Sequence, residues 1–119
     1  DVQAGVGKLK NFEAVFTATL TVDKPRQITF KVLADDGWIF SMGASAGGSQ
    51  PTYVSGPMNN APTVGPFTGY TVMGANNKGS APVASTVVVN FTASGTYPLE
   101  LDYTEARGGH LTLLLIPYM

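Results

Sequence analysis

The sequence predicts an all-β domain, an antiparallel β-sandwich or barrel with long loops. Apolar and polar residues alternate along several runs, which is typical of strands with one buried face. The chain also contains 14 Gly and 8 Pro, residues that favour turns and loops. No segment keeps a period of 3.6 for ten residues, so no helix is expected.

The whole chain, residues 1–119, is predicted to form a single domain. A domain of this size buries roughly two-thirds of its unfolded surface and needs no disulfide to be stable. Residues 1–11 have no period and are interpreted as a lead-in or a trimmed edge strand. The sequence starts at Asp1 rather than at Met, which favours a mature fragment or an excised domain.

The first strong pattern covers residues 12–22 and predicts a half-buried strand. One face of it carries the apolar residues Phe12, Ala14, Phe16, Ala18, Leu20 and Val22. Residues 23–26 are typical of a turn, and residues 27–33 alternate again with Ile28, Phe30 and Val32 inward. We expect the two runs to form a hairpin.

The middle of the chain, residues 43–82, is rich in Gly, Ser, Pro and Asn. Since a structureless loop of this length is unusual in a compact domain, we expect loops around short strands at 52–54 and 68–73. Just before this region, Trp38 shares its register with Phe40 and Met42. That register favours a core position over a platform for a sugar ring. Three aromatic residues of the middle region are freer to be exposed: Tyr53, Phe67 and Tyr70.

Three further strands are predicted in the last third of the chain. Residues 86–91 are strongly β-like, and residues 97–103 alternate with Tyr97, Leu99, Leu101 and Tyr103 inward. Glu100 and Asp102 then fall on the opposite face, where we expect them to be exposed to solvent. Residues 111–116 are almost entirely apolar, which favours a central strand.

Composition excludes several classes of function. The net charge is −1 and 13% of residues are charged, so there is no basic surface for nucleic acid and no polybasic membrane patch. No apolar run approaches the roughly 20 residues of a membrane-spanning helix, so no membrane insertion is expected. The absence of cysteine excludes disulfides and thiolate chemistry.

The most distinctive motif is Asp35-Asp36-Gly37, directly after a predicted strand. Neighbouring strand side chains point to opposite faces. A bent or cis peptide between Asp35 and Asp36 would instead bring both carboxylates to one point. Paired carboxylates suit Ca²⁺, which takes about 6–8 oxygen ligands. The alternative is an ordinary turn at a strand end, where Asp before Gly is common.

Two segments in this order resemble bacterial PA14-type modules: A-D-D-G-W-I-F at 34–40 and G-T-Y-P-L-E-L-D-Y-T-E-A-R-G-G-H-L-T-L at 95–113. Modules of this family are β-sandwich domains of extracellular enzymes, toxins and adhesins. The resemblance covers roughly residues 12–117 and implies the PA14 type of sandwich. In its lectin-like members, an Asp-Asp pair binds calcium and the ion binds vicinal hydroxyls of a sugar.

Carried over to this chain, the resemblance implies a calcium site formed by Asp35 and Asp36. Glu105 would add a side-chain ligand, and the backbone carbonyls of Arg107 and Gly109 would complete the site. Asp35, Asp36 and Arg107 would also contact the carbohydrate. Glu105 stands where the sugar-binding members have Asn; the extra charge favours calcium but changes the hydrogen bonding to a glycan.

The sequence therefore predicts a calcium-dependent carbohydrate-binding module, extracellular or at the cell surface. Its partner would be a glycan or polysaccharide, and it would be part of a larger multidomain enzyme or adhesin. The alternative is a structural or adhesive spacer that calcium makes rigid and that binds no small molecule. We do not expect an enzyme, because adjacent Asp residues that share one cation do not make a general acid–base pair. His110, the single histidine, also has no Cys partner.

Overall fold

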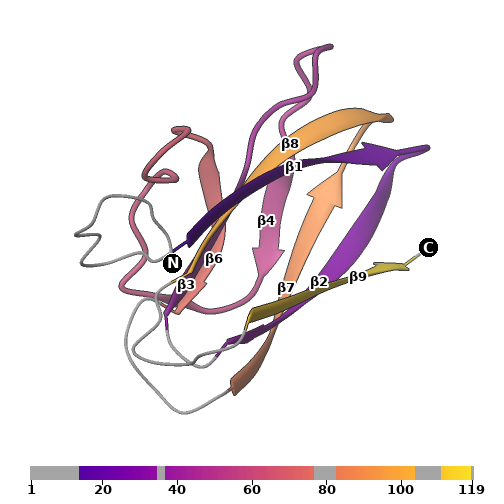
Figure 1. Ribbon diagram of the computed structural model, residues 1–119. Helices are drawn as coiled ribbons and strands as arrows, with labels where there is room; N and C mark the ends of the chain where they lie inside the picture. Colours follow the sequence, from indigo (N-terminus) through magenta and orange to yellow (C-terminus); the bar gives the residue numbers. More distant parts are fainter. Residues whose placement is uncertain (1–13, 35–36, 77–82, 104–110, 119) are drawn as a thin grey trace.

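The computed structural model describes residues 14–34, 37–76, 83–103 and 111–118. Over these residues the chain forms nine β-strands and no helix (Figure 1). The strands are β1 Ala14–Val22, β2 Arg26–Ala34, β3 Trp38–Met42, β4 Thr52–Ser55, β5 Met58–Asn59, β6 Thr71–Asn76, β7 Val83–Phe91, β8 Gly95–Tyr103 and β9 Leu111–Tyr118.

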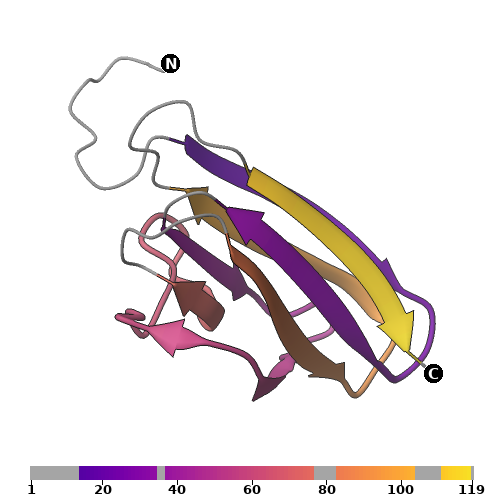
Figure 2. The same ribbon diagram turned by 90° about the horizontal axis from the view of Figure 1, so that it is seen from below.

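The strands form two sheets that pack as the two layers of a sandwich (Figure 1, Figure 2). The five-stranded sheet has the order β1-β8-β3-β6-β5, and the four-stranded sheet has the order β4-β7-β2-β9. All strand pairs are antiparallel except β5 with β6. The predicted all-β sandwich is therefore confirmed. No helix within the described ranges is long and apolar enough to cross a membrane.

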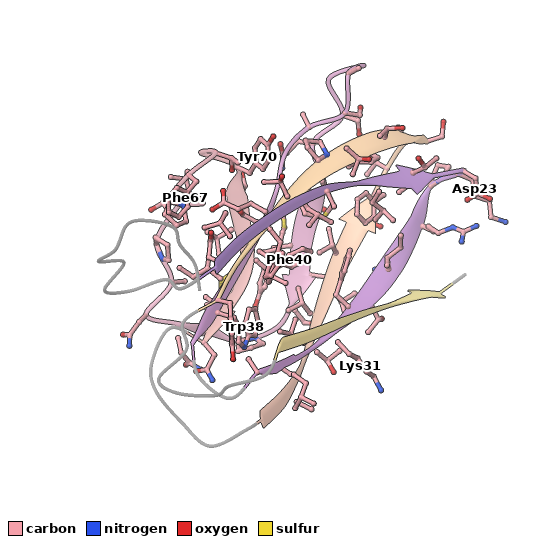
Figure 3. The ribbon with its side chains drawn as sticks, in the orientation of Figure 1. Asp23, Lys31, Trp38, Phe40, Phe67 and Tyr70 are labelled. Atoms are coloured by element: carbon pink, nitrogen blue, oxygen red, sulfur yellow. The ribbon has the colours of Figure 1, made fainter. Side chains whose placement is uncertain are left out.

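The core lies between the sheets and follows the period-two alternation of the strands. On the five-stranded sheet, Trp38, Phe40 and Met42 are buried with Tyr97, Leu99, Leu101 and Tyr103. On the four-stranded sheet, the buried set includes Ile28, Phe30, Val32, Val87, Val89 and Phe91. The rings of Phe30 and Phe40 join the layers, with centroids 4.7 Å apart. Trp38 is 1% exposed, so its predicted core position is confirmed (Figure 3).

Gly74 lies where the two sheets approach each other closely. It pairs with Phe40 at a register shift between β3 and β6. A Cβ at this position would lie 2.6 Å from Cγ2 of Val87 and 3.3 Å from the ring of Trp38. Only a residue without a side chain fits between these two buried neighbours.

We predict that Gly74→Ala destabilises the domain by about 1–3 kcal/mol, the usual cost of overpacking a core. Chemical denaturation monitored by Trp38 fluorescence measures the change. Gly47→Ala is the matched control, because a Cβ there would have no neighbour closer than 3.9 Å. Equal stability of the two variants would contradict the tight packing at Gly74.

The predicted hairpin between the first two strands is wrong. β1 pairs with β8 in one sheet, and β2 pairs with β7 and β9 in the other. The turn at residues 23–25 therefore carries the chain from one layer to the other. Turn residues specify a change of direction, and a strand can leave a turn toward either sheet.

Two further expectations about strands need correction. β9 lies at the end of the order in its sheet, whereas its apolar sequence predicted a central strand. Phe16, on the predicted buried face of β1, is 51% exposed. β1 is likewise at the end of its sheet's order. The alternation of apolar and polar residues does not show how far the opposite sheet covers such a strand.

The middle of the chain contains the short strands β4 and β5 and then a segment without regular strands, residues 60–70, which we call the covering segment. The predicted strand at 52–54 is confirmed by β4, and the one at 68–73 begins later, at Thr71. Ala61 packs against Ile39, Val72 and Ala75. These residues lie on the face of the five-stranded sheet that points away from the core, and this face we call the outer face.

Candidate functional site

The predicted calcium ligands belong to segments that begin and end at one end of the sandwich. At this end, Ala34 of β2 pairs with Leu111 of β9, and Trp38 of β3 pairs with Tyr103 of β8. The chain passes here between the two sheets, from β2 to β3 and from β8 to β9. We call this the crossing end. It is opposite the turn that contains Asp23 (Figure 3).

The chain crosses between the sheets a third time at the crossing end, from β6 to β7. Asn76, the last residue of β6, pairs with Trp38, and Val83, the first residue of β7, pairs with Ala34. The strand ends that flank residues 35–36, 77–82 and 104–110 are thus neighbours in the two sheets. Two of these segments contain the predicted site residues.

The predicted site residues themselves, Asp35, Asp36, Glu105, Arg107 and Gly109, lie outside the described residues. Next to them, Gly37 is buried. In the part of the chain that the structure describes, no group of three or more His, Asp or Glu side chains could hold a metal ion. The calcium site therefore stays a prediction.

A second feature of the five-stranded sheet, a pair of buried carboxyl groups, was not expected from the sequence. Glu100 and Asp102 lie on β8, on the outer face as predicted, but both are 0% exposed. The expectation that they are exposed to solvent is wrong. The covering segment lies over Glu100 and removes it from water.

Glu100 holds the covering segment through hydrogen bonds to its carboxylate. The backbone N–H of Thr68 donates to Oε1 at 2.9 Å, and that of Phe67 donates to Oε2 at 3.3 Å. The hydroxyl of Thr68 also donates to Oε1. Gly65 permits this approach, because a Cβ there would lie 2.7 Å from Oε1. A buried carboxylate with several donors is a strong anchor.

The pKa values of the two carboxyls are displaced in opposite directions. Burial, the hydrogen bond with Glu100 and the negative charge of Glu100, in this order of size, together raise the pKa of Asp102 from 3.8 to about 8. Burial also acts to raise the pKa of Glu100. The hydrogen bonds from Asp102, Thr68 and Phe67 outweigh this effect, and the net pKa is lowered. At neutral pH, Glu100 is therefore ionised and Asp102 is protonated.

The neighbours of Asp102 explain why its carboxyl stays neutral. The strands on either side place Val15 and Ile39 opposite it. Neither of its oxygens has a hydrogen-bond partner of standard geometry among the described residues, and its interaction is with the carboxyl of Glu100. A second buried negative charge beside Glu100 would be costly, so the Asp102 carboxyl keeps its proton.

The chain was compared with protein-family models, curated proteins and solved structures. None of them matches.

Glu100 fixes the covering segment, and both carboxyls are fully buried. Sequence reasoning missed this because strand period gives the face of a residue and not what covers that face. The covering segment, rich in Gly, Pro and Thr, has no period that would predict where it lies. The alternation of β8 gives no signal of this burial, because acidic residues on the polar face of a strand are usual where that face meets solvent.

Proposed function

We propose that this chain is a calcium-dependent carbohydrate-binding module of an extracellular enzyme or adhesin. The observation that supports this best is the pairing of strand ends at the crossing end, Ala34 with Leu111 and Trp38 with Tyr103. Through it, the Asp35-Asp36 segment and the segment with Glu105, Arg107 and Gly109 depart from neighbouring strands.

The chemistry of these residues supports the same proposal. Three carboxylates and backbone carbonyls are the hard oxygen ligands that Ca²⁺ binds, about 6–8 to each ion. When bound, the ion would supply coordination to two neighbouring hydroxyls of a sugar. The protein would supply the negative charge that holds the ion and, through Arg107, a donor to the glycan.

We expect calcium to raise the thermal stability of the domain, because a ligand that binds only the folded state stabilises it. At a free calcium concentration 100 times the Kd, the gain is about 2.7 kcal/mol. Thermal denaturation in calcium and in EDTA measures it. Asp36→Ala is expected to remove the gain. Asp23→Ala is the matched control, because Asp23 is an exposed residue that pairs with Arg26 at the opposite end.

A glycan array separates the two functions considered for the module. The carbohydrate-binding proposal requires a component of glycan binding that depends on calcium and that EDTA and Asp36→Ala both remove. Calcium stabilisation with a blank array would instead identify the calcium-stiffened spacer. No effect of calcium on the unmodified domain would contradict both.

A further inference from the structure

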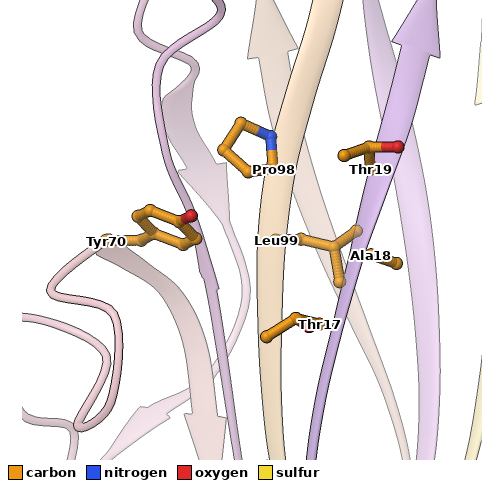
Figure 4. A pocket seen from close by; sticks show the side chains of 6 residues that line it. All are labelled: Thr17, Ala18, Thr19, Tyr70, Pro98 and Leu99. Atoms are coloured by element: carbon orange, nitrogen blue, oxygen red, sulfur yellow. The ribbon is translucent and has the colours of Figure 1, made fainter.

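The outer face of the five-stranded sheet contains a groove of about 350 Å³. It is lined by Thr17, Ala18, Thr19, Tyr70, Pro98 and Leu99. Figure 4 shows these residues on β1, on β8 and at the end of the covering segment. The groove is shallow and open to solvent.

Tyr70 is held in a fixed position beside this groove. Its carbonyl accepts from the N–H of Gly65 at 2.7 Å, and its N–H donates to the hydroxyl of Thr68 at 3.2 Å. Thr68 is in turn anchored to Glu100. The Tyr70 ring lies against Gly43, where a Cβ would be 2.7 Å from Cδ1 of the ring. The ring is thus ordered before any ligand arrives, which lowers the entropic cost of binding.

The lining combines an aromatic ring with neutral hydroxyl groups and contains no charged residue. Thr17 and Thr19 are exposed on β1, and further along the same face the hydroxyls of Thr21 and Thr96 lie 3.4 Å apart. A hydroxyl both donates and accepts hydrogen bonds, as a sugar hydroxyl does. Phe67, on the same segment as Tyr70, is 56% exposed (Figure 3).

We propose that this groove is a second carbohydrate subsite, which binds a pyranose ring of a neutral polysaccharide without calcium. The apolar face of the pyranose packs on the Tyr70 ring, and its hydroxyls exchange hydrogen bonds with Thr17 and Thr19. The aromatic ring supplies contact area at low entropic cost, and the threonine hydroxyls supply orientation.

The groove is separate from the crossing end. Its lining residue nearest to that end, Thr17, pairs with Glu100, which is three residues before Tyr103 on β8, or roughly 10 Å along a strand. The subsite therefore does not depend on the proposed calcium site, and each can fail without the other.

The test uses the full chain in EDTA, with a panel of neutral soluble polysaccharides: a β-glucan, a xylan, a mannan and a galactomannan. Affinity electrophoresis and titration calorimetry are expected to detect binding to at least one of them. Tyr70→Ala is expected to weaken this binding about tenfold or more, and Thr19→Val about threefold to tenfold, because one hydrogen bond is lost. Tyr70→Phe, which keeps the ring, is expected to bind within about threefold of the unmodified chain.

Tyr53→Ala is the matched control, since Tyr53 is 43% exposed on β4 of the other sheet. No binding to any of the four polysaccharides in EDTA overturns the proposal. Binding that survives Tyr70→Ala and Thr19→Val in folded protein, as checked by thermal denaturation, also overturns it. If an extended apolar peptide binds at Tyr70 and the polysaccharides do not, the groove is a peptide site instead.

Discussion

Asp102→Asn is expected to stabilise the domain at pH 8 and to remove most of the pH dependence of its stability between pH 4 and pH 8. The folded-state pKa of Asp102, about 8, lies above its ordinary value of 3.8. In this window the folded state keeps a proton that the unfolded state releases. The free energy of unfolding therefore falls as the pH rises, by up to about 1.4 kcal/mol per pH unit. Asn is neutral at every pH and does not contribute this slope.

Urea denaturation at pH 5, 6, 7 and 8 measures the effect of Asp102→Asn. We expect the variant to exceed the unmodified protein by about 2–5 kcal/mol at pH 8 and by much less at pH 5. Asp23→Asn is the control, because Asp23 is exposed and pairs only at the surface with Arg26. A slope in Asp102→Asn as steep as in the unmodified protein would show that another group causes the pH dependence.

Glu100→Gln is expected to destabilise the domain by about 2–4 kcal/mol at pH 5, because it weakens the anchor of the covering segment. The carboxylate accepts from the backbone amides of Phe67 and Thr68. The Gln side chain has one acceptor oxygen and an NH₂ group, so at least one amide loses its partner. Each hydrogen bond to a charged group contributes about 1.5–3 kcal/mol.

Hydrogen exchange gives a local measurement of the same change. The amides of residues 67 and 68 are expected to lose protection in Glu100→Gln, and those of the core strands much less. The pKa of Asp102 is also expected to fall, because its charged neighbour is gone, so the slope of stability against pH becomes shallower. Ser41→Ala is the matched control: its hydroxyl is buried opposite Glu100 and has no hydrogen-bond partner among the described residues. Unchanged protection at 67 and 68 would contradict the anchoring role.

Local patterns predicted most of the strands and, for the interior strands, their buried faces. The core positions of Trp38, Phe40 and Tyr97 follow from alternation, since a residue on the apolar face of an interior strand has few other places to go. The pairing of strands was harder to predict. β1 and β2 are adjacent in sequence and have a good turn between them, yet they belong to different sheets. Which strand pairs with which depends on contacts between residues distant in sequence. A short stretch of sequence does not contain these contacts.

For the candidate sites, too, the features with a local sequence signal were predicted, and those that depend on contacts distant in sequence were not. The motif at 35–37 was found from the sequence because carboxylates at a strand end are a local signal. That its segment departs from the same end as residues 104–110 required the registers of β2 with β9 and of β3 with β8. The burial of Glu100 and the groove beside Tyr70 both depend on the path of the covering segment. This path is set by tertiary hydrogen bonds to one side chain.

The pairing of β1 with β8 also bears on how the chain acquires its structure. Ala14 lies opposite Tyr103, and Arg26 at the start of β2 lies opposite Phe91. Contacts of such long sequence separation form late and place a protein among the slow folders, on the millisecond-to-second scale. Among the described strands β1 pairs only with β8, so during synthesis this pair cannot form until β8 has left the ribosome. An early-made strand that waits in this way is a natural point for a chaperone to act.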